Sequence, residues 1–246
     1  MPSAVFDPFR PSPRRSDDEG DQFLLNRAGE DLVDVIGIPP ARCAIVGDPG
    51  VTVRRWLDAH GVVPDRLDER PLQVGAADAI LADPAYRDAV GRYDLVLAAG
   101  VFERSNAPDL AAAVLGGLLA SGGRLAGAIV GGGSLSALRD ALLAVDREAG
   151  RAAIRIHPMI DGSGLAGLLA GAGLGDPVVT VDRVRVRYGS FDRLVSDLRR
   201  MGCSRRLVAP SPSLTKSQWR ALRAGVDGPF TERFDLLHFH ALKADA

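Results

Sequence analysis

The turn Gly47-Asp48-Pro49-Gly50 is the stretch of this sequence that best fits a ligand site. It follows an apolar run over residues 43–46 and precedes a helix-compatible segment over residues 52–60. Glycine lets the main chain approach a ligand, and the first N–H groups of a helix are free to bind it. In an open α/β sheet a nucleotide-like ligand lies beyond such a strand, so the spacing predicts one here. Asp-Pro-Gly is also a common turn sequence, and a plain strand-to-helix turn stays the alternative.

Two further groups of side chains could bind a ligand or a partner. His238 and His240 are two residues apart on an expected strand and share one face, but no third metal ligand is evident. We therefore expect both histidines to be structural and predict no metal site. Arg183, Arg185 and Arg187 alternate along another strand and could hold an acidic partner. The alternative is an outward face that protects a sheet edge.

The composition narrows the class of protein. A length of 246 residues suits one α/β domain with additions, or at most two small domains. A formal net charge of −1 gives no reason to expect nucleic acid as a partner. Cys43 and Cys203 are far apart and form no CxxC pair, so we expect neither a disulfide framework nor a cysteine zinc site. This cysteine usage predicts a reducing, cytoplasmic location. The sequence has no apolar run long enough to span a bilayer, so no membrane span is expected.

The elements around the turn predict a covered, mostly parallel sheet. Near-continuous apolar strands alternate with helical patterns, which is typical of an α/β fold with helices on both faces. The expected strands cover residues 43–46, 62–68, 79–81, 93–98, 124–130, 178–181 with 184–188, and 234–242. The expected helices cover residues 23–36, 52–60, 110–119, 135–148, 164–171, 190–201 and 219–224. We thus expect a Rossmann-like sheet of seven strands, the last of them antiparallel.

The chain is expected to form one domain with an arm. Residues 1–20 are rich in Pro, Arg, Ser and Asp, which predicts a flexible arm with Phe6 and Phe9 as anchors. Residues 21–246 would form the domain. Within it, residues 131–175 and 189–230 would be helical cap segments inserted around the sheet, the first directly after strand five.

Several short strings follow one another in an order typical of one superfamily. Tyr-Asp-Leu-Val at 93–96 precedes Leu-Ala-Ser-Gly-Gly-Arg-Leu at 119–125, which is similar to the "LKPGG-L" signature of class I S-adenosylmethionine-dependent methyltransferases. Val-Gly-Gly-Gly-Ser-Leu at 130–135, His157-Pro158 and Leu-Ala-Gly-Leu-Leu at 165–169 follow. Their succession resembles the branch that holds the mitochondrial complex I assembly methyltransferase-like factor and the biotin-pathway (malonyl carrier protein) methyltransferases. The resemblance covers residues 22–243.

The first motif departs from that family. The family reads Asp-Leu-Gly-Cys-Gly-Thr-Gly or similar, whereas Ile45 stands here at the acidic position and Pro49 at the middle glycine. Gly47 matches a glycine of the family motif, and Gly50 lies close to the position of another. Proline fixes φ near −65° and has no N–H, so the loop loses a donor where the methionine moiety would bind. After the fourth strand, Ala99-Gly100 replaces the usual His-Trp.

The resemblance implies S-adenosylmethionine as the cofactor and a role for particular carboxylates. The protein mainly positions cofactor and acceptor for this reaction, which needs no metal. Asp68, with Glu69 as its rival, would accept hydrogen bonds from the ribose; a solvated charge is the alternative. Asp83 would meet the adenine amino group, unless it only caps a helix. Glu103 would deprotonate or bind the acceptor, unless it is a surface carboxylate. The implied cofactor-binding set is Gly47, Asp48, Gly50, Asp68, Asp83 and Ala99.

Two functions stay open from the sequence. The first is methyl transfer to an oxygen or nitrogen acceptor on a small molecule, a carrier or a protein. The second is an assembly or interaction factor with a degenerate methyltransferase fold and weak or absent cofactor binding, which the altered first motif favours. Arginine hydroxylation, associated with the complex I factor, ranks last because no triad of iron ligands is evident. A nicotinamide dehydrogenase is disfavoured because residues 47–52 lack the GxGxxG spacing.

Overall fold

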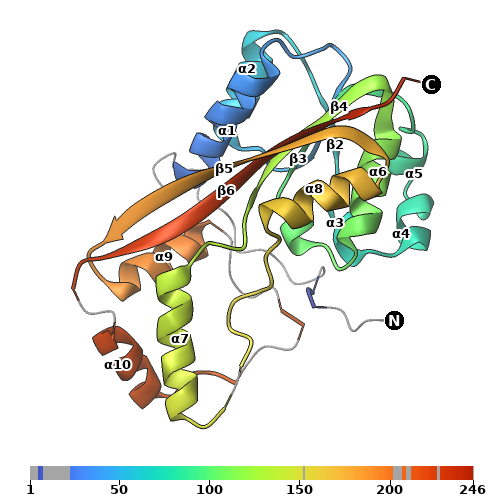
Figure 1. Cartoon of the computed structure of the whole chain (residues 1–246). Coiled ribbons are helices and arrows are strands. Elements are labelled where there is room, and N and C mark those ends of the chain that lie inside the picture. Colours follow the sequence, from blue (N-terminus) through green and yellow to red (C-terminus); the bar gives the residue numbers. More distant parts are fainter. Residues whose placement is uncertain are drawn as a thin grey trace.

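A computed structural model describes residues 5–7, 23–151, 153–201, 207–208, 212–225 and 228–245. In this part of the chain six strands form one sheet in the order β2-β1-β3-β4-β6-β5 (Figure 1). The strands are β1 Cys43–Gly47, β2 Asp65–Leu67, β3 Tyr93–Ala99, β4 Leu119–Val130, β5 Leu174–Tyr188 and β6 Phe230–Lys243. Strands β2, β1, β3 and β4 pair in parallel, while β6 runs antiparallel to both β4 and β5. The predicted Rossmann-like sheet and its antiparallel last strand are therefore confirmed.

The prediction of a strand at residues 79–81 is wrong, and the sheet has six strands rather than seven. Ala77–Ala82 form helix α4 instead. A strand buried in a covered sheet needs apolar contacts on both faces. Here Ile80 is 3% exposed, but Leu81 is 65% exposed, so the segment has one buried side chain and one that faces solvent. Farther along, the two predicted strands at 178–181 and 184–188 form the single long strand β5.

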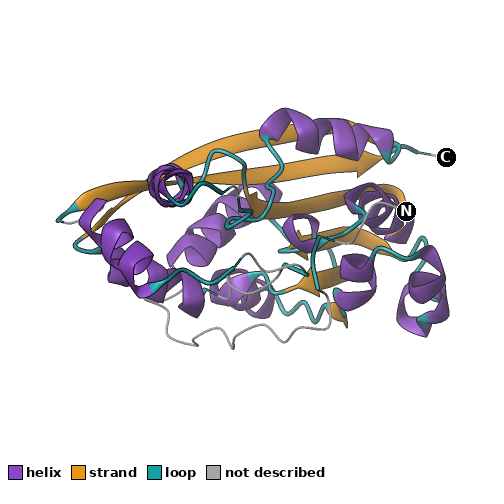
Figure 2. Cartoon of the chain, turned by 90° about the horizontal axis from the view of Figure 1, so that it is seen from below, coloured by secondary structure: helices purple, strands orange, loops and turns teal. Residues whose placement is uncertain are grey.

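Helices cover both faces of the sheet, as predicted (Figure 2). Alternate residues of the same strands point to opposite faces. Val96 and Ala98 pack in the cluster that contains side chains of α6 and α8, and Leu95 and Leu97 pack in the cluster that contains side chains of α1 and α2. The helices are α1 Phe23–Ile36, α2 Gly50–Ala59, α3 Arg70–Val74, α4 Ala77–Ala82, α5 Pro84–Arg87, η2 Phe102–Arg104, α6 Pro108–Leu118, α7 Ser136–Glu148, α8 Gly162–Gly171, α9 Phe191–Arg200 and α10 Lys216–Gly225.

Strands β5 and β6 extend past the parallel part of the sheet. Pairing between β4 and β6 ends at Val130 and Leu236, whereas β5 continues to pair with β6 out to Tyr188 and Phe230. Helices α7, α9 and α10 lie beside this two-stranded extension (Figure 1). Their apolar side chains form one cluster with α1 and β6, which includes Leu138, Leu194, Leu222, Phe234 and Leu24.

A short piece of the expected N-terminal arm is docked on the domain. Phe6 is 7% exposed and pairs with Leu207 in an isolated antiparallel bridge. Residues 1–4 and 8–20 of the arm, including the predicted anchor Phe9, lie outside the described residues. Among the helices that the structure describes, none combines the length and apolarity needed to cross a membrane.

Candidate functional site

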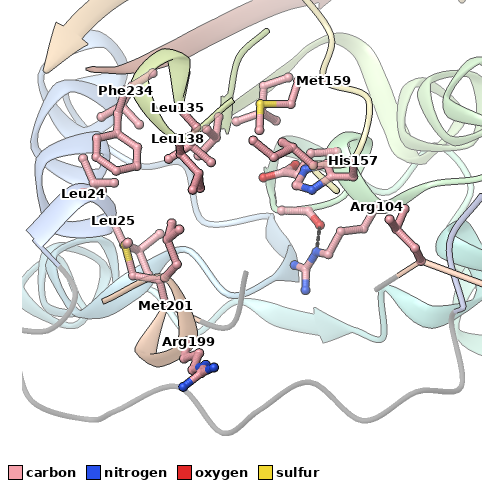
Figure 3. A pocket seen from close by; sticks show the side chains of 18 of the residues that line it. Leu24, Leu25, Arg104, Leu135, Leu138, His157, Met159, Arg199, Met201 and Phe234 are labelled. Carbon is pink, nitrogen blue, oxygen red and sulfur yellow. Dashed lines mark hydrogen bonds between the residues drawn. The ribbon is translucent and has the colours of Figure 1, made fainter. Parts of the chain in front are cut away.

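A cavity of about 590 Å³ opens at the carboxyl ends of β1 and β3 (Figure 3). Gly47 and Ala99, the last residues of these strands, are register partners. The chain leaves β1 toward β2 on one side and returns to β3 on the other, so the order of strands reverses between them. Doubly wound sheets bind their ligands at such a reversal. The walls formed by Asp48, Pro49 and Gly100 place the cavity at this position.

The two glycines of the turn are required by contacts inside the protein. Gly47 has φ +85°, and a Cβ there would clash with the Ala99 carbonyl oxygen. Gly50 also has φ +85°, and its missing Cβ leaves room for the Leu25 side chain of α1, whose Cγ would lie 2.8 Å away. L-residues with side chains rarely adopt this conformation. In the sequence these glycines suggested close approach of a ligand. In the structure they instead allow β3 and α1 to pack closely against the turn.

Asp48 organises the turn. Its Oδ1 accepts hydrogen bonds from the Gly50 N–H at 3.0 Å and from an Arg54 side-chain N–H at 2.6 Å. The N–H that the sequence offered to a ligand is therefore bonded to a neighbouring carboxylate. The Asp48 side chain itself lines the cavity and brings negative charge to its wall.

The segment after β3 adds two charged side chains. Glu103 and Arg104 lie in the single turn η2, and both line the cavity. The Arg104 Nε donates to the Gly100 carbonyl oxygen at 2.7 Å, and its guanidinium points into the cavity (Figure 3). Gly100 has φ +71°, and a Cβ there would collide with this guanidinium. Glycine at position 100 thus makes room for Arg104.

His157 completes the polar part of the wall. It lies on the same side of the cavity as Arg104 (Figure 3), and its ring packs edge-on against Phe6 with 5.8 Å between the centroids. Burial, and then the nearby charges of Arg104 and Arg139, lower the pKa of His157 below its ordinary value of 6.5. The imidazole is therefore neutral at pH 7 and able to accept a proton. We call Asp48, Glu103, Arg104 and His157 the polar end of the cavity.

The predicted site residues separate into two groups, all within the described chain. Asp48, Ala99 and Glu103 line the cavity, while Gly47, Gly50, Asp68 and Asp83 do not. The exposed Asp68 accepts from the Arg70 Nε at 2.7 Å, and this contact lowers the pKa of its carboxyl. Asp83 caps α5 through the Ala85 N–H at 2.9 Å.

Sequence reasoning missed Arg104, and it named His157 only as part of the His157-Pro158 string. No local pattern marks either residue as part of a site. They meet only because the segment after α7 folds back over the end of β3, which is a tertiary contact without a signal in the neighbouring sequence.

Most of the rest of the cavity is apolar, and Arg155, Arg199 and Ser213 are polar residues of its lining. We call this part the apolar chamber; its walls come from α1, α7, α9, α10, β6 and the connection between α7 and α8. Its lining includes Leu24, Leu135, Leu138, Leu142, Ile156, Met159, Val195, Leu198, Met201, Leu214, Trp219 and Phe234. Figure 3 shows Leu24, Leu135, Leu138 and Phe234 on the side of the cavity away from Arg104.

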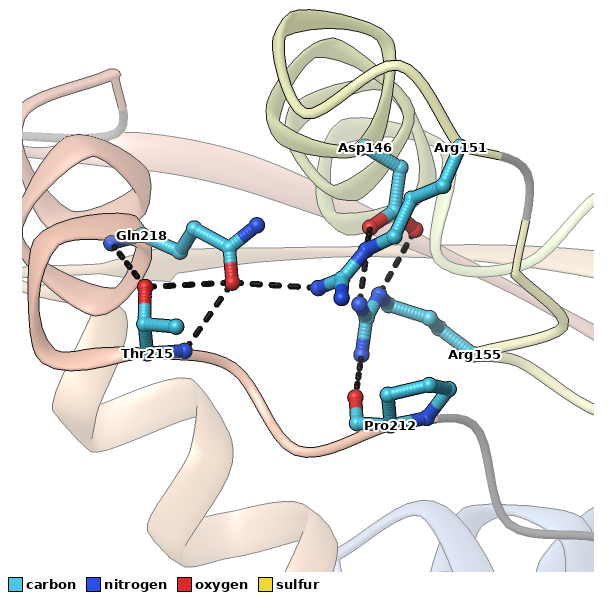
Figure 4. Close-up of polar contacts among 6 residues, drawn as sticks. All are labelled: Asp146, Arg151, Arg155, Pro212, Thr215 and Gln218. Carbon is cyan, nitrogen blue, oxygen red and sulfur yellow. Dashed lines mark hydrogen bonds and ion pairs between the residues drawn. The ribbon is translucent and has the colours of Figure 1, made fainter.

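A buried ion-pair network holds the outer wall of the chamber (Figure 4). Asp146, 2% exposed at the end of α7, accepts two hydrogen bonds of 2.7 Å from Arg155 and one of 3.1 Å from Arg151. Arg155 also donates to the Pro212 carbonyl oxygen at 3.0 Å, and Arg151 donates to Gln218 at 3.0 Å. The network therefore connects α7 to the two loops that close the chamber.

The other polar groups that the sequence singled out lie outside the cavity lining. Arg183, Arg185 and Arg187 are exposed on β5, which is the edge strand of the sheet. His238 is 6% exposed, and its Nε2 lies 3.4 Å from Asp31 of α1. Burial lowers the pKa of both His238 and His240. Over the described ranges, no three His, Cys, Asp or Glu side chains gather into a group that could hold a metal.

Comparisons with known proteins agree with the fold. No family model and no curated protein matches the sequence. A candidate methyltransferase of Bacillus halodurans C-125 has a TM-score of 0.52 at 11% identity, over 89% of this chain and 99% of its own. YcgJ of Bacillus subtilis has a TM-score of 0.50 at 8% identity, with the same coverage of 89% and 99%. A 1,6-didemethyltoxoflavin-N1-methyltransferase of Burkholderia thailandensis has a TM-score of 0.46 at 18% identity, over 92% and 80%. At such identities the first two likenesses bear on architecture alone, and the chain shares the Rossmann-like α/β fold of these structures.

Proposed function

We propose that the chain is an S-adenosylmethionine-dependent methyltransferase that acts on an oxygen or nitrogen acceptor. The observation that carries the proposal is the cavity at the reversal between β1 and β3, in a fold shared with a candidate methyltransferase. The succession of strings in the C-terminal half supports a place near the complex I assembly factor and the biotin-pathway methyltransferases. An acceptor on a small molecule, a carrier or a protein is compatible with this proposal.

The polar end suits the amino-acid part of the cofactor. S-adenosylmethionine supplies a methyl group whose bond to sulfur breaks with the electron pair left on sulfur, and it carries an ammonium and a carboxylate. Asp48 and Glu103 suit its cationic groups, and the Arg104 guanidinium suits its carboxylate. Because Pro49 has no N–H and the Gly50 N–H is bonded to Asp48, side chains rather than the main chain of the turn would bind it.

Glu103 is the proposed base. A neutral hydroxyl or amine acceptor must lose a proton as its new bond to carbon forms, and a carboxylate within reach can take that proton and release it to water. Glu103 lines the cavity, and its Oε2 atom is shielded from solvent. His157 is the second group at the polar end that can accept a proton, since burial holds it neutral.

Calorimetric titration with S-adenosylmethionine and S-adenosylhomocysteine tests the proposal. We expect both to bind more tightly than about 100 μM, or roughly −5.5 kcal/mol. Arg104→Ala should weaken binding about tenfold because a charge-assisted contact to the carboxylate is lost. Arg87→Ala, an exposed arginine paired with Asp88 on the surface, is the matched control and should bind like the original chain. No heat with either compound, together with no thermal shift, would overturn the proposal.

The second candidate function is an assembly or interaction factor with this fold and little or no cofactor binding. Two observations favour it: Leu25 covers Gly50, and the Asp68 carboxylate is held by Arg70 outside the cavity lining. In that case the exposed Arg183, Arg185 and Arg187 of the edge strand are the proposed contacts for an acidic protein. The absence of cofactor binding in the same titrations would favour this function.

A further inference from the structure

The apolar chamber offers few of the polar groups that the cofactor needs, since Arg155, Arg199 and Ser213 are the polar exceptions in its lining. The polar end already provides the charged groups that suit a sulfonium amino acid, whereas the chamber is lined by leucine, methionine and aromatic side chains such as Leu138, Met201 and Phe234. Apolar surface that faces a cavity is stabilised when a nonpolar ligand displaces water from it. The lining therefore indicates a second ligand of low polarity beside the first.

The chamber is built in advance of binding. Asp146, 2% exposed, and the side chain of Arg155, 10% exposed, fix the connection after α7 to the Pro212 loop. Buried and mutually hydrogen-bonded, these charges hold the wall in one position. A preformed chamber avoids the entropy cost of ordering its walls around a ligand.

The two parts of the cavity are continuous, so a ligand in the chamber can reach the polar end. Figure 3 shows Met159 next to His157, with Leu135 and Leu138 on the chamber side and Arg104 on the other. An amphiphilic molecule would place its nonpolar body against α7 and its polar atom near Glu103.

We infer that the apolar chamber binds the methyl acceptor by a hydrocarbon body and presents its reacting oxygen or nitrogen to the polar end. The inference rests on the proposed methyl transfer and adds the class of acceptor to it: a nonpolar small molecule with one polar end. In the reaction the acceptor atom gains the methyl carbon and loses its proton to Glu103, while the sulfur keeps the electron pair of the broken bond.

Titration with N-phenyl-1-naphthylamine, an uncharged fluorophore that brightens in nonpolar sites, tests the chamber. We expect saturable binding at one site per chain. Leu142 and Leu143 of α7 provide a matched pair of variants, because Leu142 lines the chamber and Leu143 is 52% exposed. Leu142→Glu should weaken binding at least about tenfold, since it brings a carboxylate into the nonpolar site. Leu143→Glu should leave the affinity unchanged.

A second variant distinguishes weaker binding from loss of folding. Leu142→Phe keeps the position apolar but adds volume, so it should also weaken binding of the fluorophore while the thermal transition stays cooperative. Equal affinities in the Leu142 and Leu143 variants, or binding that does not saturate, would overturn the inference.

Parallel titrations with S-adenosylhomocysteine separate this inference from the proposed function. Cofactor binding without fluorophore binding would leave the methyltransferase proposal standing and remove the nonpolar acceptor. Fluorophore binding that depends on Leu142, with no binding of either cofactor form, would overturn the acceptor role together with methyl transfer. Binding of both compounds supports both conclusions.

Discussion

At the scale of single residues, two glycines share a backbone conformation but differ in surroundings. Gly47 at φ +85° faces the Ala99 carbonyl oxygen, whereas Gly37 at φ +75° has open space where a Cβ would stand. At either position the positive φ would strain the backbone of an alanine. Only Gly47 would in addition force β1 away from β3, at the mouth of the cavity.

We therefore expect Gly47→Ala to destabilise the protein much more than Gly37→Ala. The backbone term alone costs about 1 kcal/mol in each variant. The clash at Gly47 should raise its cost to about 3 kcal/mol or more. Urea unfolding of the two variants measures the difference. Equal losses would show that β1 and β3 are not in the close contact described.

Asp68 gives a second prediction for a single residue. The resemblance assigns its carboxylate to a ribose, but the structure bonds it to Arg70 and leaves it out of the cavity lining. From the structure we expect Asp68→Ala to change the calorimetric affinity for S-adenosylhomocysteine by less than about twofold, or about 0.4 kcal/mol. A tenfold loss would restore the ribose role and require Asp68 to turn toward the ligand.

At the scale of elements, Asn106 fastens the docked N-terminal piece to the loop between η2 and α6. Its Oδ1 accepts the N–H groups of Val5 and Phe6 at 2.9 and 2.8 Å, and its Nδ2 donates to the Phe6 carbonyl oxygen at 2.9 Å. Phe6 in turn lines the cavity. One amide side chain thus holds one part of the cavity wall.

Asn106→Ala should release that piece. We expect hydrogen exchange at the amides of Val5 and Phe6 to accelerate by about tenfold or more, because each lost bond contributes about 1 kcal/mol. Asn106→Asp keeps the accepting oxygen and should retain most of the protection. Unchanged exchange in Asn106→Ala would mean that the bridge to Leu207 alone holds the segment.

The buried network at the end of α7 offers a test of the chamber wall. Asp146→Asn leaves Arg155 and Arg151 without their carboxylate, and breaking a buried pair costs about 3–5 kcal/mol. Asp192→Asn removes the partner of Arg223 in a pair whose side chains are about 60% exposed, and should cost about 0.5 kcal/mol or less. Thermal unfolding of both variants compares them. Similar losses would indicate that Asp146 is hydrated.

Elements were predictable where burial was uniform. The strand at 93–98 follows from a run of apolar residues that matches a covered sheet, the last strand follows from alternation over residues 234–242, and both exist as β3 and β6. Residues 79–81 contain the same residue types but form α4, because a short apolar run does not reveal whether both of its faces will be covered. The sequence could therefore specify the long strands but not the short one.

At the scale of the whole molecule, three histidines make stability depend on pH. Burial lowers the pKa of His157, His238 and His240 below 6.5 in the folded chain. The unfolded chain then binds more protons than the folded chain in the window just below pH 6.5. The free energy of unfolding therefore falls as the pH drops through that window toward the folded-state pKa values.

We expect the unfolding free energy to be constant near pH 7–8 and to decrease between about pH 6.5 and 5. His157→Gln should make this decrease shallower, because one buried group no longer takes up a proton on unfolding. Denaturant titrations of this variant and of the original chain at several pH values measure the two slopes, and identical slopes would contradict the assignment to His157.

The site as a whole could be predicted only in part. Asp48, Ala99 and Glu103 were found because strand ends are visible in the sequence and strand ends form one edge of a parallel sheet. The apolar chamber was not predicted, since its side chains come from α1, α7, α9 and β6. Within its own segment each of them looks like an ordinary core residue. Only the folded arrangement leaves a space between them.

The ribbon formed by β5 and β6 has a consequence for how such a protein can diversify. Residues 183–188 pair with residues 230–235 beyond the last β4 pairing, and α7 and α9 pack against this ribbon. Two-stranded ribbons twist more strongly than wide sheets do. Substitutions in the ribbon could therefore change the shape of the apolar chamber, and with it the ligands that fit, while the reversal between β1 and β3 stays intact. Recognition of new ligands could thus evolve while the carboxyl ends of β1 and β3 are kept.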